Sequence, residues 1–64
     1  MRELLSKEDK EGVEFIFRYA LRHSEDLNEW QLNTLASIES QYKGDGMLSK
    51  PQVALVFRIF EEMR

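Results

Sequence analysis

Polar side chains between Gln41 and Gln52 have part of the spacing of a calcium-binding loop. Asp45 and Gly46 occupy the fifth and sixth positions of such a loop. The first, third and twelfth positions are filled by Gln41, Lys43 and Gln52, so the bidentate glutamate that completes the site is missing. A segment that offers one carboxylate cannot hold the ion, and we predict no metal site here.

The other polar residues do not form a pattern typical of hydrolysis or group transfer. The chain has no cysteine, and its one histidine, His23, cannot build a zinc site with the ligands left. The sequence contains no nucleophile–base pair and no glycine-rich phosphate loop. We therefore expect a non-catalytic protein with no cofactor and no small-molecule substrate. We interpret the carboxylates near the N-terminus as a solvated helix face: Glu8, Asp9, Glu11 and Glu14.

Basic residues favour one alternative function, the direct binding of nucleic acid, through Arg18, Arg22, Lys43 and Lys50. Lys50 stands near the start of a predicted helix, where helix-turn-helix proteins place base-reading side chains. The turn before it is longer than that motif allows. The formal net charge of −3 argues against a general nucleic-acid binder, although it leaves room for a local basic patch.

Two helix start signals of one kind position these residues. Asn28 and Ser49 are strong N-caps, because a short side-chain oxygen accepts from unpaired N–H groups of the first helical turn. Gln31 and Gln52 stand three residues further on, where a capping box has its second partner. Each pair therefore predicts where a helix begins.

With Ser6 as a third N-cap, these signals predict an all-α, three-helix bundle. The helices are expected at about residues 7–23, 29–42 and 50–63. A turn at Gly44-Asp45-Gly46 separates the second helix from the third, and residues 1–5 form an irregular lead-in. A chain of 64 residues is long enough for one domain, 1–64.

Apolar residues at helical spacing predict the core. The first helix has a buried face that includes Leu21 at its end, and Gly12 within it indicates the close approach of another backbone or a helix start nearer to this residue. The second helix has an apolar stripe that starts at Leu32. The core is expected to consist of Val13, Ile16, Phe17, Ala20, Leu32, Leu35, Ile38, Val53, Val56 and Phe60.

The third helix carries more apolar surface than two neighbouring helices are expected to cover. Residues 53–60 are apolar at every position but one. Phe15 and Tyr19 lie off the predicted buried face, either on a wide core face or on a partner-binding surface, and Trp30 is either a lid over the end of the bundle or an anchor. We predict a protein-interaction module that docks on another protein or self-associates as a homodimer through helices 1 and 3. Its partner-binding residues are predicted to be Phe15, Tyr19, Trp30, Leu55 and Ile59.

The sequence contains no apolar stretch of about 18–20 residues and no basic-then-apolar leader, so no membrane contact is expected and the predicted location is cytoplasmic.

Part of the chain resembles a known module. The residues that carry the resemblance are Leu27-x2-Trp30-x4-Leu35-x-Ser37-Ile38, a glycine-containing turn, and Leu48-Ser49-x2-Gln52-x3-Val56-x2-Ile59. This pattern resembles a short helical hairpin that recurs in phage-type DNA-processing proteins, attached to or encoded near helicases, nucleases and replication factors. Thr34 departs from it, because the module tends to carry a large apolar residue there. The resemblance implies an accessory or docking element, phage or bacterial, in DNA metabolism, with no catalytic residues to carry over.

Overall fold

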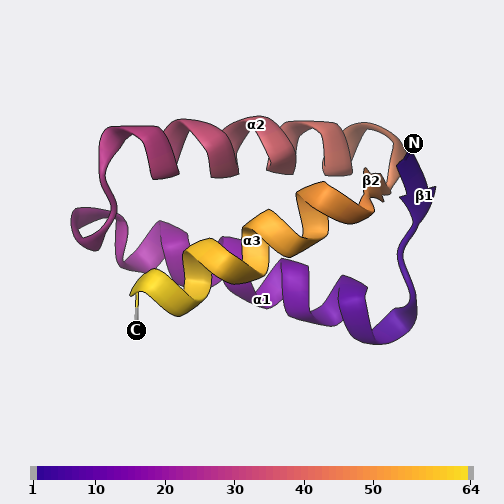
Figure 1. The fold of residues 1–64 in the computed structure, drawn as a ribbon, viewed down its shortest axis with the longest axis horizontal. Coiled ribbons are helices and arrows are strands. Elements are labelled where there is room, and N and C mark those ends of the chain that lie inside the picture. The colour runs from indigo at the N-terminus through magenta and orange to yellow at the C-terminus, as the bar shows by residue number, and fades with distance from the viewer. Residues whose placement is uncertain (1, 64) are drawn as a thin grey trace.

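A computed structural model describes residues 2–63, and most of them belong to helices (Figure 1). The elements along the chain are β1 (Arg2–Leu4), α1 (Lys7–Arg22), the 3-10 helix η1 (Ser24–Asp26), α2 (Glu29–Asp45), β2 (Met47–Ser49) and α3 (Lys50–Met63). α2 runs back along α1, and α3 passes below α2 and crosses in front of α1 (Figure 1). The expected three α-helices are present, together with a small sheet that the sequence did not predict.

The predicted capping residues start the helices. The Asn28 side chain accepts from the Gln31 backbone N–H at 2.8 Å, and the Gln31 side chain accepts from the Asn28 backbone N–H at 3.0 Å. Ser49 and Gln52 form the same reciprocal pair, at 3.3 and 2.8 Å. Ser6 caps α1 by accepting from a backbone N–H of the first turn. These side chains satisfy donors that the helices leave unpaired at their N-termini.

The second helix is longer than predicted. Gly44 and Asp45 belong to its last turn, and the chain leaves the helix at Gly46, which has the left-handed φ of 74°. The Gly46 N–H donates to the Tyr42 carbonyl at 2.7 Å, as is typical of a glycine that ends a helix. The predicted three-residue turn is therefore confined to its last residue.

Two short strands tie the start of the chain to the connection between α2 and α3. β1 pairs with β2 in antiparallel register, with Glu3 opposite Leu48 and Leu4 opposite Met47. The prediction of an irregular lead-in was wrong for residues 2–4, and its first residue, Met1, lies outside the described part of the chain. Strands of three residues are too short to show a period of two in the sequence.

The core lies where α1, α2 and α3 meet, and it consists of Val13, Ile16, Phe17, Ala20, Leu27, Leu35, Ile38, Leu48, Val56 and Ile59. Val53 and Phe60, which were predicted to be core residues, are half-buried and pack against its edge. Leu27 and Leu48 stand directly before Asn28 and Ser49, and the predicted core did not include them.

The prediction that α3 needs cover from another molecule was wrong. Ile59, expected on a docking surface, is 1% exposed, and Leu55 is half-buried against the core. The cover comes from the other two helices, because α1 packs on α3 and Trp30 of α2 lines a hollow together with Leu55 and Ile59. Among residues 2–63 the exposed large hydrophobic residues lie on β1, α1 and α2: Leu4, Phe15, Leu21, Trp30 and Leu32.

Candidate functional site

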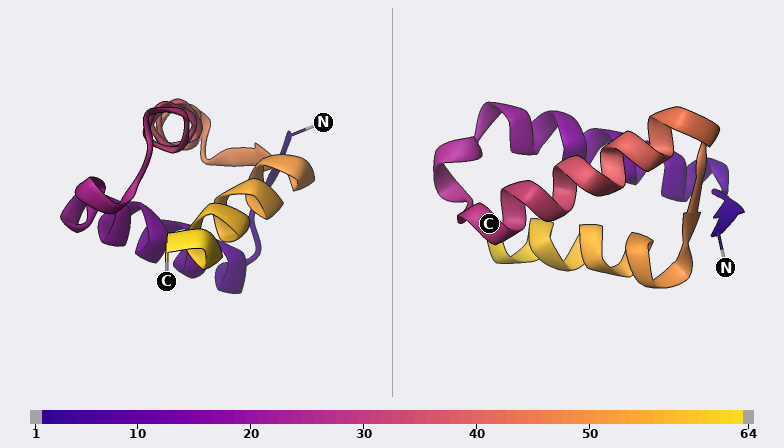
Figure 2. Two further views of the ribbon diagram at one scale, coloured as in Figure 1. Left: turned by 60° about the vertical axis from the view of Figure 1, so that its left-hand side comes forward. Right: turned by 90° about the horizontal axis from the view of Figure 1, so that it is seen from above.

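The structure has an apolar groove between α1 and α2, and two residues that were predicted to be buried are exposed in it. Leu21 is 81% exposed and Leu32 is 38% exposed, although both were expected to face inward. α1 packs mainly on α3, whereas α2 packs mainly on β2 and α3. α2 therefore stands apart from α1 on this side (Figure 2). The groove is lined by Phe17, Ala20, Leu21, Ser24, Leu27, Leu32, Leu35, Ala36 and Glu39.

The floor of the groove is the core itself. Ala20, Leu27 and Leu35 are buried side chains that belong to the core and also line the groove. Leu21 and Leu32 form its walls, and the polar members of the lining are Ser24 and Glu39. We call this surface the α1–α2 groove.

A second apolar feature is a ladder of aromatic rings on α1. Phe15, which is 50% exposed, has its ring 6.1 Å from that of Tyr19, and the Tyr19 ring stacks on that of His23 at 4.3 Å. Phe60 of α3 supports both Phe15 and Tyr19 with edge-on contacts at 5.8 and 5.2 Å. Such geometry is favourable for aromatic pairs. The ladder holds Phe15 in place while half of its surface stays in contact with solvent.

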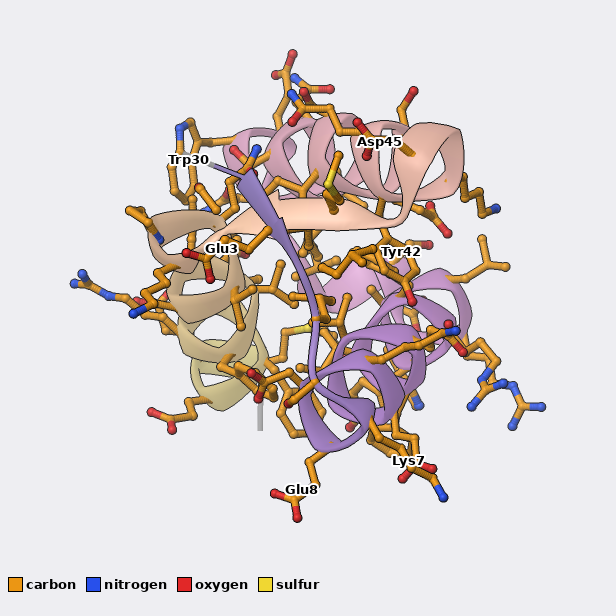
Figure 3. The ribbon with its side chains drawn as sticks, turned by 90° about the vertical axis from the view of Figure 1, so that its right-hand side faces the viewer. Glu3, Lys7, Glu8, Trp30, Tyr42 and Asp45 are labelled. Carbon is orange, nitrogen blue, oxygen red and sulfur yellow. The ribbon has the colours of Figure 1, made fainter. Side chains whose placement is uncertain are left out.

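The five predicted partner-binding residues thus fall into two separate groups. Phe15 and Tyr19 share the aromatic ladder, whereas Trp30, Leu55 and Ile59 line a small hollow between α2 and α3. Trp30 lies at the start of α2 (Figure 3) and is 58% exposed. It covers part of the hollow and leaves more than half of its own surface open.

The four basic residues of the nucleic-acid alternative do not share one hollow, although Arg18 lines one hollow with Lys43 and another with Arg22. Arg18 and Arg22 border the aromatic ladder, and neither forms an ion pair within residues 2–63. Lys43 is paired with Glu39 at 3.4 Å. Lys50 lines a different hollow, between β1 and α3.

One polar contact joins α1 and α2. The Tyr42 hydroxyl donates to a Glu14 carboxylate oxygen at 2.6 Å, and Tyr42 lies between the two helices (Figure 3). Burial, together with the hydrogen bond and the negative charge of Glu14, raises the pKa of Tyr42 to about 12. This contact lies beyond the groove toward the C-terminal end of α2, and it helps to set the separation of the two helices.

Three side chains that follow α1 lie close enough together to coordinate a cation. Ligand atoms of His23, Glu25 and Asp26 lie within 4.8 Å of one another. The two acids are exposed, and the His23 ring already stacks on Tyr19. Exposed acidic groups of this kind are common without an ion, and we assign no metal site to them.

Comparison with known proteins gives no relative from which a function can be inferred: no protein-family model, no curated protein and no solved structure matches the chain. Within residues 2–63 no helix has the length and apolar character needed to cross a membrane.

Proposed function

We propose that this protein is a non-catalytic protein-interaction module that docks through the α1–α2 groove. The observation that carries the proposal is that Leu21 and Leu32, each predicted to lie on the buried face of its helix, are 81% and 38% exposed within residues 2–63. The sequence predicted docking through helices 1 and 3, whereas we propose docking through helices 1 and 2.

Covering the two leucines would supply useful binding energy. Full burial of a leucine side chain contributes about 1.5–3 kcal/mol. Scaled by exposures of 81% and 38%, covering Leu21 and Leu32 together contributes about 2–4 kcal/mol.

The partner that fits this groove is an amphipathic helix of another protein. Two antiparallel helices with an apolar floor between them offer the seat that a fourth helix occupies in a bundle. Such a helix would present apolar residues one turn apart to Leu21 and Leu32. The resemblance to hairpins encoded near helicases, nucleases and replication factors makes these proteins the first partners to test.

Site-specific photo-crosslinking in the native host tests the proposal. A photoreactive residue at position 21 or 32 should give the same single protein adduct. The control is position 37, where Ser37 is exposed on α2 and does not line the groove. Adducts that are the same from position 37, or that differ between positions 21 and 32, contradict docking in the groove.

Direct nucleic-acid binding is the alternative, and its support is the unpaired state of Arg18 and Arg22 within residues 2–63 beside stacked rings. Titration of labelled single- and double-stranded DNA at low and high salt separates the two proposals. Binding that weakens steeply with salt and is lost on Arg18→Gln with Arg22→Gln supports the alternative. Binding that is absent at low salt excludes it.

A further inference from the structure

The outer face of α1 carries a stripe of five exposed residues whose charges change sign at its centre. Glu8, Glu11, Phe15, Arg18 and Arg22 follow one another at intervals of three and four residues, which places them along one side of a helix. All five are exposed, and Glu8 points away from the bundle (Figure 3). We call this set the α1 stripe.

The four charged members of the α1 stripe have no partners among residues 2–63. None of Glu8, Glu11, Arg18 and Arg22 takes part in an ion pair or a side-chain hydrogen bond there. Acids early and bases late in a helix also suit the helix dipole, but that effect is confined to the first and last turns. It applies to Glu8 and Arg22, and it does not extend to Glu11, Arg18 or the exposed ring of Phe15.

The stripe is complementary to itself when a second copy runs in the opposite direction. We propose that two copies of this chain pair through α1 about a two-fold axis at Phe15. Glu8 of each copy then faces Arg22 of the other, and Glu11 faces Arg18, while the two Phe15 rings meet at the centre. A parallel arrangement would place like charges together. In a two-fold interface each contact occurs twice, so the pairing makes four ion pairs from charges that are unpaired in the single copy.

Phe15, at the centre of the α1 stripe, suits the centre of such an interface. Phe15 is held by Tyr19 and Phe60 and presents half of its surface outward, as a rigid aromatic anchor at the centre of an interface does. The helix has 16 residues and a length of about 24 Å, so a single helix pair buries little area and the dimer is weak and reversible. The stripe shares no residue with the α1–α2 groove, and the dimer would leave two grooves open to partners.

Charge reversal followed by mixing tests the pairing. One variant carries Glu8→Lys with Glu11→Lys, and the other carries Arg18→Glu with Arg22→Glu. Each variant alone should have a dimer dissociation constant about a hundredfold above that of the wild type, because four attractions become repulsions. An equimolar mixture should form a heterodimer with an affinity close to that of the wild type. Glu25→Lys with Glu61→Lys changes the net charge by the same amount as Glu8→Lys with Glu11→Lys, at exposed positions outside the stripe, and is the matched control for that variant.

Sedimentation velocity up to about 1 mM protein measures these states, with circular dichroism to verify the fold of each variant. A wild-type dimer that both reversals weaken and that mixing restores supports the pairing, as does weakening by Phe15→Ser with the charges intact. A wild type that stays monomeric overturns it, and so do reversal variants that dimerise as the wild type does. Dimerisation lost only in Leu21→Ser with Leu32→Ser also overturns it, and that result leaves the groove proposal standing.

Discussion

Gly12 offers the sharpest test of the packing between α1 and α3. A methyl group at this position would lie 2.8 Å from Cζ and 3.0 Å from Cε1 of Phe57. Ordinary carbon–carbon contacts are about 3.5–4.0 Å, so the ring or the helix must move. The close approach expected at this glycine is therefore made by the ring of a side chain, where the sequence indicated another backbone or a helix start.

Two opposing terms set the effect of Gly12→Ala. Alanine is favoured over glycine inside a helix by about 1 kcal/mol. Inserting a methyl group against the Phe57 ring costs about 2 kcal/mol, in the middle of the range for an overpacked contact. We expect a net loss of about 1 kcal/mol in the free energy of unfolding and a fall in Tm of about 4–8 °C.

A double-mutant cycle with Phe57→Leu measures the second term alone. Leucine is shorter than phenylalanine, so Gly12→Ala in the Phe57→Leu background should stabilise the protein by about 1 kcal/mol. The two single variants, the double variant and the wild type are compared by urea unfolding. If Gly12→Ala stabilises both backgrounds equally, the ring does not occupy the space beside Gly12 and the reasoning fails.

The remaining predictions concern single residues. Gly46→Ala should lower the free energy of unfolding by about 1 kcal/mol because of the left-handed φ at this position. Gly44→Ala, inside α2 with open space beside it, should raise the free energy of unfolding by about 1 kcal/mol. Equal effects of the two substitutions in chemical denaturation would contradict the different roles of these glycines. Tyr42→Phe should cost about 1.5–2 kcal/mol at neutral pH, because Glu14 loses a hydrogen-bond donor. The folded protein holds the Tyr42 proton more tightly than the unfolded chain does, so this tyrosine stabilises the fold below about pH 10 and loses that contribution as the pH rises toward 12. A wild-type stability curve that falls over this range no more steeply than that of Tyr42→Phe would contradict the raised pKa. Leu21→Ser should change the free energy of unfolding by less than about 0.5 kcal/mol, and a loss above about 2 kcal/mol would show that Leu21 is buried.

The helices were predictable because their start signals are local. A capping box needs two residues three apart, and Asn28–Gln31 and Ser49–Gln52 form the boxes that their spacing indicates. The end of α2 was harder to predict, since Gly44 and Gly46 both qualify and only the backbone conformation shows which one ends the helix. The sheet was missed because pairing of β1 with β2 depends on where the chain returns in space.

The α1–α2 groove was not predicted, because burial depends on how the helices are arranged, and none of the five predicted partner-binding residues lines it. Helical spacing indicates which side of α1 faces inward, and Ile16 and Phe17 are buried as expected. It does not indicate whether a neighbour is present, so Leu21 and Leu32 were expected in the core and instead line an open groove. Ile59 was predicted to lie on a docking surface and is instead buried in the core.

The affinity of the partner identified by crosslinking tests the central claim most directly. Isothermal titration of that purified partner into the wild type and into Leu21→Ser with Leu32→Ser compares binding with and without the groove walls. We predict a dissociation constant at least about 30-fold higher for the variant, which corresponds to about 2 kcal/mol of lost apolar burial. Because Leu32 is only 38% exposed, the variant should also have a lower Tm, and circular dichroism verifies that it is folded during the titration. Equal affinity of the wild type and the variant for this partner would contradict docking through the α1–α2 groove.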